Sequence, residues 1–183
     1  MNMLASNGQL RASLLRWALF TVPLIVLLGF LSGQSGSPES AWFQSLDKPS
    51  TFPPPATFGI VWAILYVLIG IALALVCAAW GARARPAALV AFVVHFALNL
   101  AWTPTFFGAQ QLTWGLIVIL LVDVTLVIVI ALFWKVRRIA GMLLLPYLAW
   151  VLFASVLNWQ FLQLNPEADG GLPGGATERV RIG

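Results

Sequence analysis

The chain has 183 residues, of which 61% are hydrophobic and only 9% are charged. Soluble domains contain about 45–50% apolar and about 25% charged residues, so this composition excludes an ordinary soluble protein and indicates an integral membrane protein. The formal net charge is +4. Because the basic residues are scattered in twos and threes between apolar runs and form no basic face, we expect no nucleic-acid partner.

Five apolar runs approach or exceed the ~20 residues that cross a hydrocarbon core about 30 Å thick. Segments of alternating polarity, which mark a transmembrane barrel, are not visible. The sequence therefore predicts an all-α membrane protein, a five-transmembrane-helix bundle over residues 14–164. Residues 1–13 form an N-terminal extension, and residues 165–183, rich in Pro, Gly and charge, are expected to be a disordered tail without function. The five runs are Trp17–Gly33, Phe58–Ala82, Pro86–Gly108, Leu112–Trp134 and Ile139–Leu164.

The basic residues lie unevenly at the ends of these runs. In a five-span topology seven of them fall on one side, whereas the short loops on the other side carry only Lys48. Because basic loops stay in the cytoplasm, we predict a cytoplasmic N-terminus, with loop 34–57 and the C-terminus on the opposite side. The seven residues are Arg11, Arg16, Arg83, Arg85, Lys135, Arg137 and Arg138.

The first run also resembles a secretory signal, since arginines precede an apolar core that small residues follow. No Ala-x-Ala site is present, so we interpret the run as a retained first helix. The single cysteine, Cys77, lies within an apolar helix, where a packing role is expected.

The loop 34–57 is rich in proline. Prolines restrict the backbone, so the loop should be a stiff strap. It could be a lid that lies over the bundle or a rigid spacer between two helices. Trp42, Phe43 and Phe52 provide apolar groups to bury and favour the lid.

The third run carries a helical stripe of unusual composition. His95, Asn99, Trp102 and Phe106 fall at i, i+4, i+7 and i+11 and so share one face. Polar and aromatic groups in lipid need partners inside the bundle, which predicts one wall of a pocket. His95 could ligate a haem iron, but a lone histidine is more often a hydrogen-bonded packing residue. Pro104 should kink or end this helix.

The fifth run presents a second stripe of the same kind. Tyr147, Trp150, Ala154 and Asn158 share a face, and the small side chain of Ala154 leaves room for a flat guest. On the second run Trp62 and Tyr66 are one turn apart. They are either pocket residues or part of the interfacial aromatic belt.

Asp123 is the one acidic residue inside a span, and a carboxylate there is costly unless it faces the bundle interior or a partner. It could be functional, or a protonated acid that bonds a carbonyl or a hydroxyl such as that of Thr125. Catalytic sets and metal-ligand clusters are not recognisable. The pattern predicts an aromatic-lined cavity that holds a large planar apolar molecule.

Four ordered blocks of the sequence resemble the TspO/MBR family, the bacterial tryptophan-rich sensory proteins related to the mitochondrial translocator protein, also called the peripheral-type benzodiazepine receptor. The blocks are Trp42-Phe-Gln-Ser-Leu-Asp-Lys-Pro49; Phe58-Gly-Ile-Val-Trp62 with Leu65-Tyr66; Asn99-Leu-Ala-Trp102 with Phe106-Phe-Gly-Ala109; and Pro146-Tyr-Leu-Ala-Trp150 with Phe153-Ala154 and Leu157-Asn158.

The resemblance implies a five-helix bundle, commonly dimeric, in which the first loop closes over a pocket for porphyrins such as protoporphyrin IX and haem. It implies no obligatory cofactor and no metal site. It carries Trp42, Asn99, Trp102, Trp150, Ala154 and Asn158 over as pocket or pocket-supporting residues. With the residues chosen above, the expected ligand-binding set is Trp42, Phe52, Trp62, Tyr66, His95, Asn99, Trp102, Phe106, Tyr147, Trp150, Ala154 and Asn158.

This chain departs from the family pattern at two places. Ser50, Thr51 and Phe52 stand where relatives usually have tryptophans after Lys-Pro, so stacking by the lid is expected to be either weaker or taken over by Phe52. The segment Trp159-Gln-Phe-Leu-Gln163 lacks the basic residue of the sterol-recognition pattern, so sterol binding is not expected.

The leading hypothesis is a receptor or sensor in a bacterial membrane that binds porphyrins, for tetrapyrrole transport or for stress or pigment regulation. The alternative is an enzyme that degrades porphyrin in light, with Trp102 and Trp150 as redox partners. A transporter that uses Asp123 and the broken third helix is a further possibility.

Overall fold

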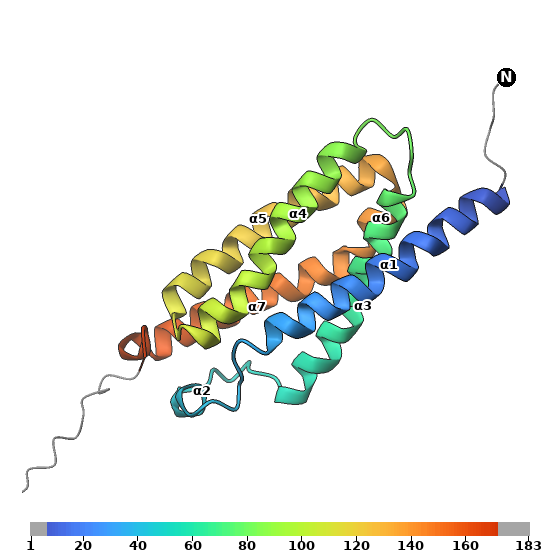
Figure 1. Cartoon of the computed structure of the whole chain (residues 1–183). Coiled ribbons are helices and arrows are strands. Elements are labelled where there is room, and N and C mark those ends of the chain that lie inside the picture. Colours follow the sequence, from blue (N-terminus) through green and yellow to red (C-terminus); the bar gives the residue numbers. More distant parts are fainter. Residues whose placement is uncertain (1–6, 172–183) are drawn as a thin grey trace, which may run out of the picture.

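The computed structural model describes residues 7–171, and within that range all regular structure is helical. The helices form one elongated bundle (Figure 1). In chain order the elements are α1 (Asn7–Gly33), α2 (Ala41–Ser45), α3 (Pro55–Cys77), α4 (Arg85–Thr103), the π-helix η1 (Pro104–Gly108), α5 (Leu112–Val136), α6 (Arg138–Leu143), α7 (Leu145–Leu164) and the 3-10 turn η2 (Pro166–Ala168).

The predicted five-span membrane fold is confirmed. Five helical segments are long and apolar enough to cross a bilayer: α1, α3, α4 with η1, α5, and α6 with α7. Two boundaries differ from the predicted ones. Residues 7–13, expected to precede the first helix, are already part of α1, and α3 begins at Pro55, where a proline is tolerated because the first helical turn needs no N–H donor.

The spans pack in neighbouring pairs. Helix α1 packs along α3, α4 along α5, and α5 along α7. The two ends of the bundle differ (Figure 1): α2 and the C-terminal segment lie at one end, and the α3–α4 loop lies at the other. We call residues 34–54 the lid and the end that carries them the lid end.

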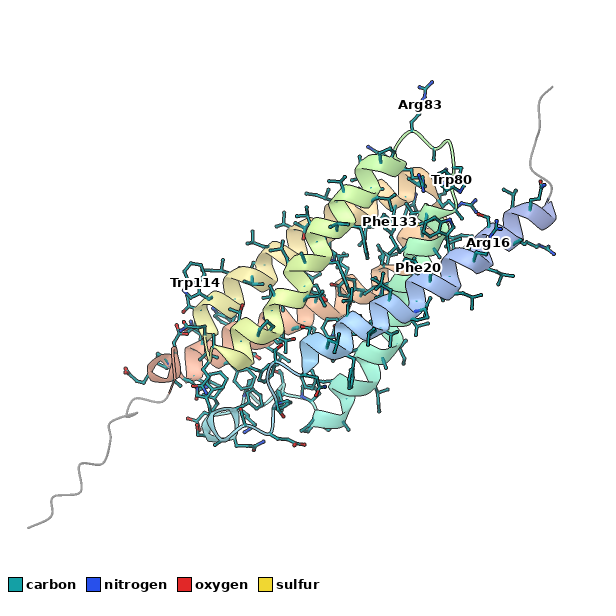
Figure 2. All side chains as sticks on the ribbon, in the orientation of Figure 1. Arg16, Phe20, Trp80, Arg83, Trp114 and Phe133 are labelled. Atoms are coloured by element: carbon teal, nitrogen blue, oxygen red, sulfur yellow. The ribbon has the colours of Figure 1, made fainter. Side chains whose placement is uncertain are left out.

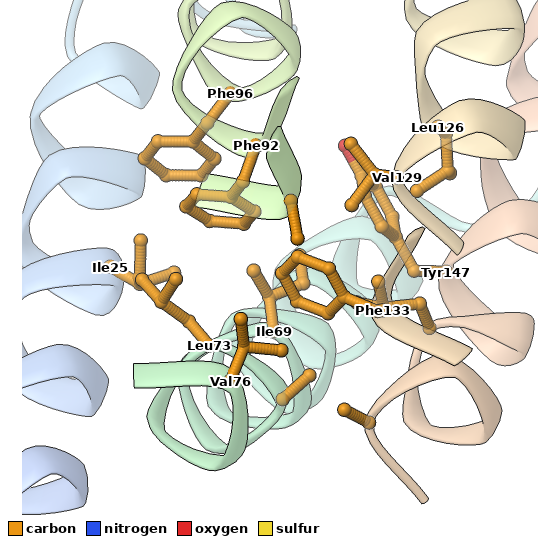
Figure 3. Close-up of a cluster of buried hydrophobic side chains, with 14 of the residues drawn as sticks. Ile25, Ile69, Leu73, Val76, Phe92, Phe96, Leu126, Val129, Phe133 and Tyr147 are labelled. Carbon is orange, nitrogen blue, oxygen red and sulfur yellow. The ribbon is translucent and has the colours of Figure 1, made fainter. Parts of the chain in front are cut away.

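The main hydrophobic core lies between the spans, with side chains from α1, α3, α4, α5 and α7 (Figure 3). On α5, Ile119, Val122, Leu126, Val129 and Phe133 recur at helical spacing and are buried. The phenyl ring of Phe133 stacks on that of Phe92 from α4, with the ring centroids 5.8 Å apart. The opposite face of α5 is also apolar, as expected of a helix that faces lipid.

A glycine lets α1 and α3 approach closely. A Cβ atom built on Gly70 would lie 2.7 Å from the Cα of Val22, which is too close for any side chain. Thr21 Oγ1 donates a hydrogen bond to Gly70 O at 2.8 Å across the same contact. The absence of a side chain at Gly70 therefore supports close packing of these two helices.

Pro104 ends α4, as predicted, and the chain continues as the π-helix η1. Because proline has no N–H, the carbonyl of Leu100 loses its usual helical donor. Ser32 of α1 replaces that donor, with its Oγ 2.7 Å from Leu100 O. The proline thus creates an acceptor that ties α1 to α4 and turns the following phenylalanines toward the lid.

The expectation of a disordered tail from residue 165 is wrong for residues 165–171. Asp169 Oδ1 accepts hydrogen bonds from the backbone N–H groups of Leu112 at 2.6 Å and Thr113 at 3.1 Å. These are the first N–H groups of α5, which lack partners inside their own helix. The capping contact is not visible from composition, which showed only Pro, Gly and charge. Residues 172–183 lie outside the described residues.

Candidate functional site

A cavity of about 320 Å³ lies at the lid end, between the lid, α3, η1 with the end of α4, and α7. Its walls are almost entirely apolar, and most of the lining side chains are aromatic. The lining side chains include Phe43 and Phe52 from the lid, Phe58 and Trp62 from α3, Trp102, Phe106 and Phe107 from α4 and η1, and Ala154, Leu157, Asn158 and Phe161 from α7.

The lid itself is packed into this end of the bundle. Ser40 Oγ accepts a hydrogen bond from Phe43 N at 3.3 Å and so caps the short helix α2. Trp42 and Phe43 are only 3% and 2% exposed. Both belong to a second hydrophobic cluster that includes Phe106 of η1. A spacer would not bury its aromatic rings in this way, so the geometry favours the lid.

The helical stripe predicted on the third run divides into two parts. Trp102 and Phe106 line the cavity and stack on each other, with ring centroids 5.0 Å apart and planes 23° apart. His95 and Asn99 lie one to two turns deeper in the bundle and do not line it.

His95 and Asn99 instead belong to a buried chain of hydrogen bonds with Tyr147. Asn99 Nδ2 donates to the Tyr147 hydroxyl at 2.7 Å, so the hydroxyl proton is available for His95 Nε2 at 3.1 Å. His95 Nδ1 is then the protonated nitrogen and donates to Thr125 Oγ1 at 3.0 Å. Thr125 donates in turn to the carbonyl of Leu121 at 2.8 Å. This arrangement supports the packing interpretation of His95 over that of a haem ligand.

The second predicted stripe, on α7, also divides. Ala154 and Asn158 line the cavity, whereas Tyr147 is buried in the hydrogen-bonded chain. Trp150 lines a separate shallow groove between α3 and α7 and packs against Phe58, with ring centroids 5.6 Å apart. Its contact with Phe58 connects it to the cavity wall. Within the described residues its indole N–H has no hydrogen-bond partner.

Asn158 is the amide of the cavity wall, and both ends of it are engaged. Its Oδ1 accepts from Trp102 Nε1 at 3.3 Å, and its Nδ2 donates to the carbonyl of Leu112 at 3.0 Å. The amide therefore fixes the Trp102 indole in the wall and joins α7 to the start of α5. The wall stays apolar because its polar groups bond one another.

The remaining predicted residues surround the cavity. Trp62 lines it and stacks on Tyr66, with ring centroids 5.1 Å apart, so Trp62 is a cavity residue and Tyr66 lies behind it. Phe52 lines the cavity from the lid. Trp42 does not line it but packs its indole edge-on against Phe106 at 5.9 Å.

Several lining residues were missed by the sequence analysis. Phe58 lies one turn before Trp62, and Phe161 lies three residues after Asn158, so helical spacing could have identified both. Phe107 could not be found in this way. The π-helix after Pro104 changes the angular spacing of side chains, and no α-helical stripe predicts its position.

Asp123 is buried outside the cavity lining, between α5 and α7. Its Oδ2 lies 2.7 Å from Ser155 Oγ, which also lies 3.0 Å from the carbonyl of Val151. The partner is thus a hydroxyl, as one of the two interpretations expected, but it belongs to Ser155 and not to Thr125, whose Oγ1 contacts His95. The other carboxylate oxygen of Asp123, Oδ1, has no hydrogen-bond partner in the described part of the chain.

Metal ligation is not supported by the side chains that the structure describes. Residues 7–171 contain no group of three or more His, Cys, Asp or Glu side chains that could hold an ion. Cys77 is buried at the end of α3, far from the lid along its helix. The arrangement can hold an apolar, flat guest by stacking and by shape, with little polar recognition inside the cavity.

Comparison with known proteins agrees with this architecture. A sequence model of the TspO/MBR family matches residues 21–164. The tryptophan-rich protein TspO of Chlorobaculum tepidum is 39% identical over 81% of this chain and 98% of its own length. The translocator protein of Homo sapiens is 38% identical over 71% of this chain and 78% of its own. The protein CrtK of Rhodobacter capsulatus is 37% identical over 69% and 79%. The chain therefore belongs to the TspO/MBR family and is a multi-pass membrane protein.

Proposed function

We propose that this protein is a membrane receptor or sensor that binds flat hydrophobic tetrapyrroles, with protoporphyrin IX and haem as the expected ligands, in the cavity beneath the lid. The observation that carries the proposal is an apolar cavity with aromatic rings from the lid, α3, η1 and α7 on its walls. Aromatic side chains stack on planar π-systems, and such cavities are the usual sites of apolar ligands.

The size of the cavity bears on how a tetrapyrrole would enter. Its volume of about 320 Å³ is close to the lower end of the ~300–1,000 Å³ range of small-molecule sites. A tetrapyrrole with its side groups is a large ligand of this class. Binding therefore requires the lid, which supplies Phe43 and Phe52 to the wall, to move outward.

The lining of the cavity favours recognition of the ring over recognition of a central metal. Residues 7–171 place no histidine, cysteine or methionine in its wall, and both nitrogens of His95 are engaged in hydrogen bonds. Haem would thus bind without an axial ligand from the cavity wall. We expect the metal-free ring and haem to bind with similar affinity.

The carboxylates of a porphyrin need a polar exit from the apolar cavity. Lys48 provides one, since its Nζ lies 5.5 Å from the ring centroid of Phe43, which lines the cavity. Among residues 7–171 it is the one basic residue in the lid or in the helix ends next to it. We expect Lys48 to pair with a ligand carboxylate at the cavity mouth.

Fluorescence titration with protoporphyrin IX tests the proposal. Wild-type protein in detergent or nanodiscs should show saturable quenching of tryptophan fluorescence, and Trp102→Phe, which removes one indole from the wall, should weaken binding at least several-fold. Trp114→Phe is the matched control, because Trp114 is 59% exposed on the outer face of α5 (Figure 2). Quenching that does not saturate in the wild type would refute the proposal.

The same titration with the dimethyl ester of protoporphyrin separates ring from carboxylate recognition. Lys48→Ala should weaken binding of the free acid and leave binding of the ester unchanged. Equal loss for both ligands would mean that Lys48 acts only through its contact with Phe43.

Light-dependent porphyrin breakdown is the second candidate function. Two indoles, Trp62 and Trp102, line the cavity and could exchange an electron with an excited porphyrin. Illumination of the bound complex in air should then bleach the porphyrin faster than free porphyrin. A Trp62→Phe/Trp102→Phe double variant that still binds should abolish the difference. Equal bleaching rates in the wild-type complex and in free solution would reject the enzyme.

We further propose that the lid end faces away from the cytoplasm and that the protein forms a homodimer. Arg16 and Arg83 lie at the opposite end of the bundle (Figure 2). There Arg85 stacks on Trp80 at 4.1 Å and donates to the carbonyl of Cys77 at 3.2 Å, which closes the end of α3. Basic residues at this end support its cytoplasmic placement.

A further inference from the structure

We propose that residues 165–171 form a latch that holds the lid closed, so that its release limits the entry and exit of ligand. The match to the TspO/MBR family ends at residue 164, so the latch lies outside the matched segment. Closure of the lid is a property of the ligand-free protein, whereas its effect on ligand exchange rests on the proposed binding function.

The hydrogen bonds that fix the lid to the bundle involve mainly this C-terminal segment. Asn165 and Asp47 form a reciprocal pair: Asn165 Oδ1 accepts from Asp47 N at 2.7 Å, and Asn165 Nδ2 donates to Asp47 O at 2.9 Å. Trp42 Nε1 donates to the carbonyl of Ala168 at 3.2 Å. One turn earlier, on α7, Gln160 Oε1 accepts from Thr51 Oγ1 at 2.6 Å.

These four hydrogen bonds are the ones that join the lid to elements other than its chain neighbours α1 and α3, within residues 7–171. The ends of the lid are held covalently by those two helices. Its middle, which carries the aromatic rings of the cavity wall, is held by the latch and by apolar contact. Loss of the latch therefore leaves the part of the lid that must move held only by apolar contact and by the hydrogen bond from Thr51 to Gln160.

The latch is in turn fixed to the start of α5. Asp169 Oδ1 accepts from Leu112 N and Thr113 N, and Gly170 N donates to Gln110 O at 2.9 Å. The carboxylate and the helix N-terminus attract each other, which strengthens these bonds. Leu112 also accepts from the cavity amide of Asn158 through its carbonyl, so one residue connects the latch with the cavity wall.

The latch is built to open more easily than the bundle. Asp47 is exposed and Asn165 and Asp169 are half-exposed, so water can replace their hydrogen bonds when the latch is released. Only Ala168 of the segment is buried, in the cluster with Trp42 and Phe161. Few buried apolar contacts and exposed hydrogen bonds are the marks of a segment that opens locally.

Hydrogen–deuterium exchange of the full-length, ligand-free protein tests the latch. Asp169→Ala removes the capping carboxylate, and Asn165→Ala removes the reciprocal pair with Asp47. Loss of a helix cap of this kind corresponds to a change of about 2–30-fold in an equilibrium constant. Each variant should therefore raise the exchange rate of lid amides in residues 41–52 by about that factor, with no change in α4.

Glu167→Ala is the matched control. Glu167 is an exposed acid in the same segment, and the structure, over residues 7–171, gives it no hydrogen bond or ion pair. Removal of its side chain should leave the hydrogen–deuterium exchange rates of the lid amides unchanged. If Asp169→Ala loses helical circular dichroism, Asn165→Ala decides the question, because it removes the pair with Asp47 and leaves the cap of α5 in place.

A second experiment measures the rate at which bound protoporphyrin IX is released, by stopped-flow fluorescence. Both latch variants should release the bound ligand about 2–30-fold faster than the wild type, and Glu167→Ala should not. Hydrogen–deuterium exchange of the lid amides that is equally slow in the wild type, Asn165→Ala and Asp169→Ala would refute the proposed latch. Faster lid exchange without any porphyrin binding by the wild type would instead reject the proposed function and retain the latch.

Discussion

Replacement of Tyr147 by phenylalanine tests the buried hydrogen-bonded chain with a single atom. The Tyr147 hydroxyl lies 2.7 Å from Asn99 Nδ2 and 3.1 Å from His95 Nε2, and the residue is only 1% exposed. Tyr147→Phe keeps the ring, which packs edge-on against Trp62 with centroids 6.0 Å apart. The variant should fold but should be less stable, because two buried polar groups lose their shared partner.

The size of the effect follows from the two lost bonds. Hydrogen bonds between membrane helices contribute about 0.6 kcal/mol each on average, which gives a lower figure of about 1 kcal/mol. An unsatisfied buried group costs about 1–3 kcal/mol in soluble proteins, so with partial relaxation the loss should reach about 3 kcal/mol. For a chain of this size each kcal/mol corresponds to about 2–4 °C in Tm.

Thermal unfolding followed by circular dichroism in one detergent measures this effect, and Tyr66→Phe is the control. Tyr66 is the only other tyrosine, and its hydroxyl has no hydrogen-bond partner among the described residues. A Tyr147→Phe variant that loses no more stability than Tyr66→Phe would refute the directional chain. A double-mutant cycle with Asn99→Ala should give a coupling energy above about 0.5 kcal/mol.

Two further predictions concern small residues. Ala154→Leu should fill part of the cavity wall and weaken protoporphyrin IX binding at least about tenfold, whereas Ala131→Leu, on the outer face of α5, should not change binding; fluorescence titration measures both. Gly70→Ala should destabilise the protein by about 1–3 kcal/mol, because the new Cβ would meet the backbone of Val22. Gly59→Ala, with nothing within 4 Å of the new Cβ, should stabilise α3 by about 0.5–1 kcal/mol, and Tm measured by circular dichroism compares them.

The five spans could be predicted because lipid imposes a strong and simple rule. Every backbone group inside the membrane needs a partner within its own helix, so length and hydropathy are sufficient to locate α3 or α5. The exact ends were less predictable. The break at Leu144 that separates α6 from α7 is one example: it precedes Pro146 and disturbs no hydropathy signal.

The candidate site was only partly predictable from stripes of residues on a helix. A stripe gives a face of the helix but not the depth at which the cavity begins. The stripe of α4 therefore includes His95, which bonds Tyr147 in the core, as well as Trp102, which lines the cavity. Contacts between distant segments, such as Asn165 with Asp47, have no local signal at all.

The hydrogen bonds of the polar residues differ in their roles along the length of the bundle. Deep in the membrane, Tyr147 joins α7 to α4 through His95 and Asn99, and Ser155 joins α7 to Asp123 of α5. Water cannot replace these bonds there, so this half of the bundle is held in one arrangement.

At the lid end, the lid forms hydrogen bonds with the exposed segment 165–171, where water can compete for these bonds. The Asn158 amide lies at the boundary between the two regions: it bonds Trp102 in the cavity wall and the carbonyl of Leu112, whose N–H bonds Asp169. A ligand that displaces the Trp102 indole would therefore act on Asn158 and Leu112, and through them on the cap that Asp169 provides. Opening of the lid can thus be coupled to occupation of the cavity while the deep half of the bundle keeps its arrangement. Within residues 7–171 no side-chain hydrogen bond joins these two sets of residues, which are connected through the helices α4, α5 and α7 themselves.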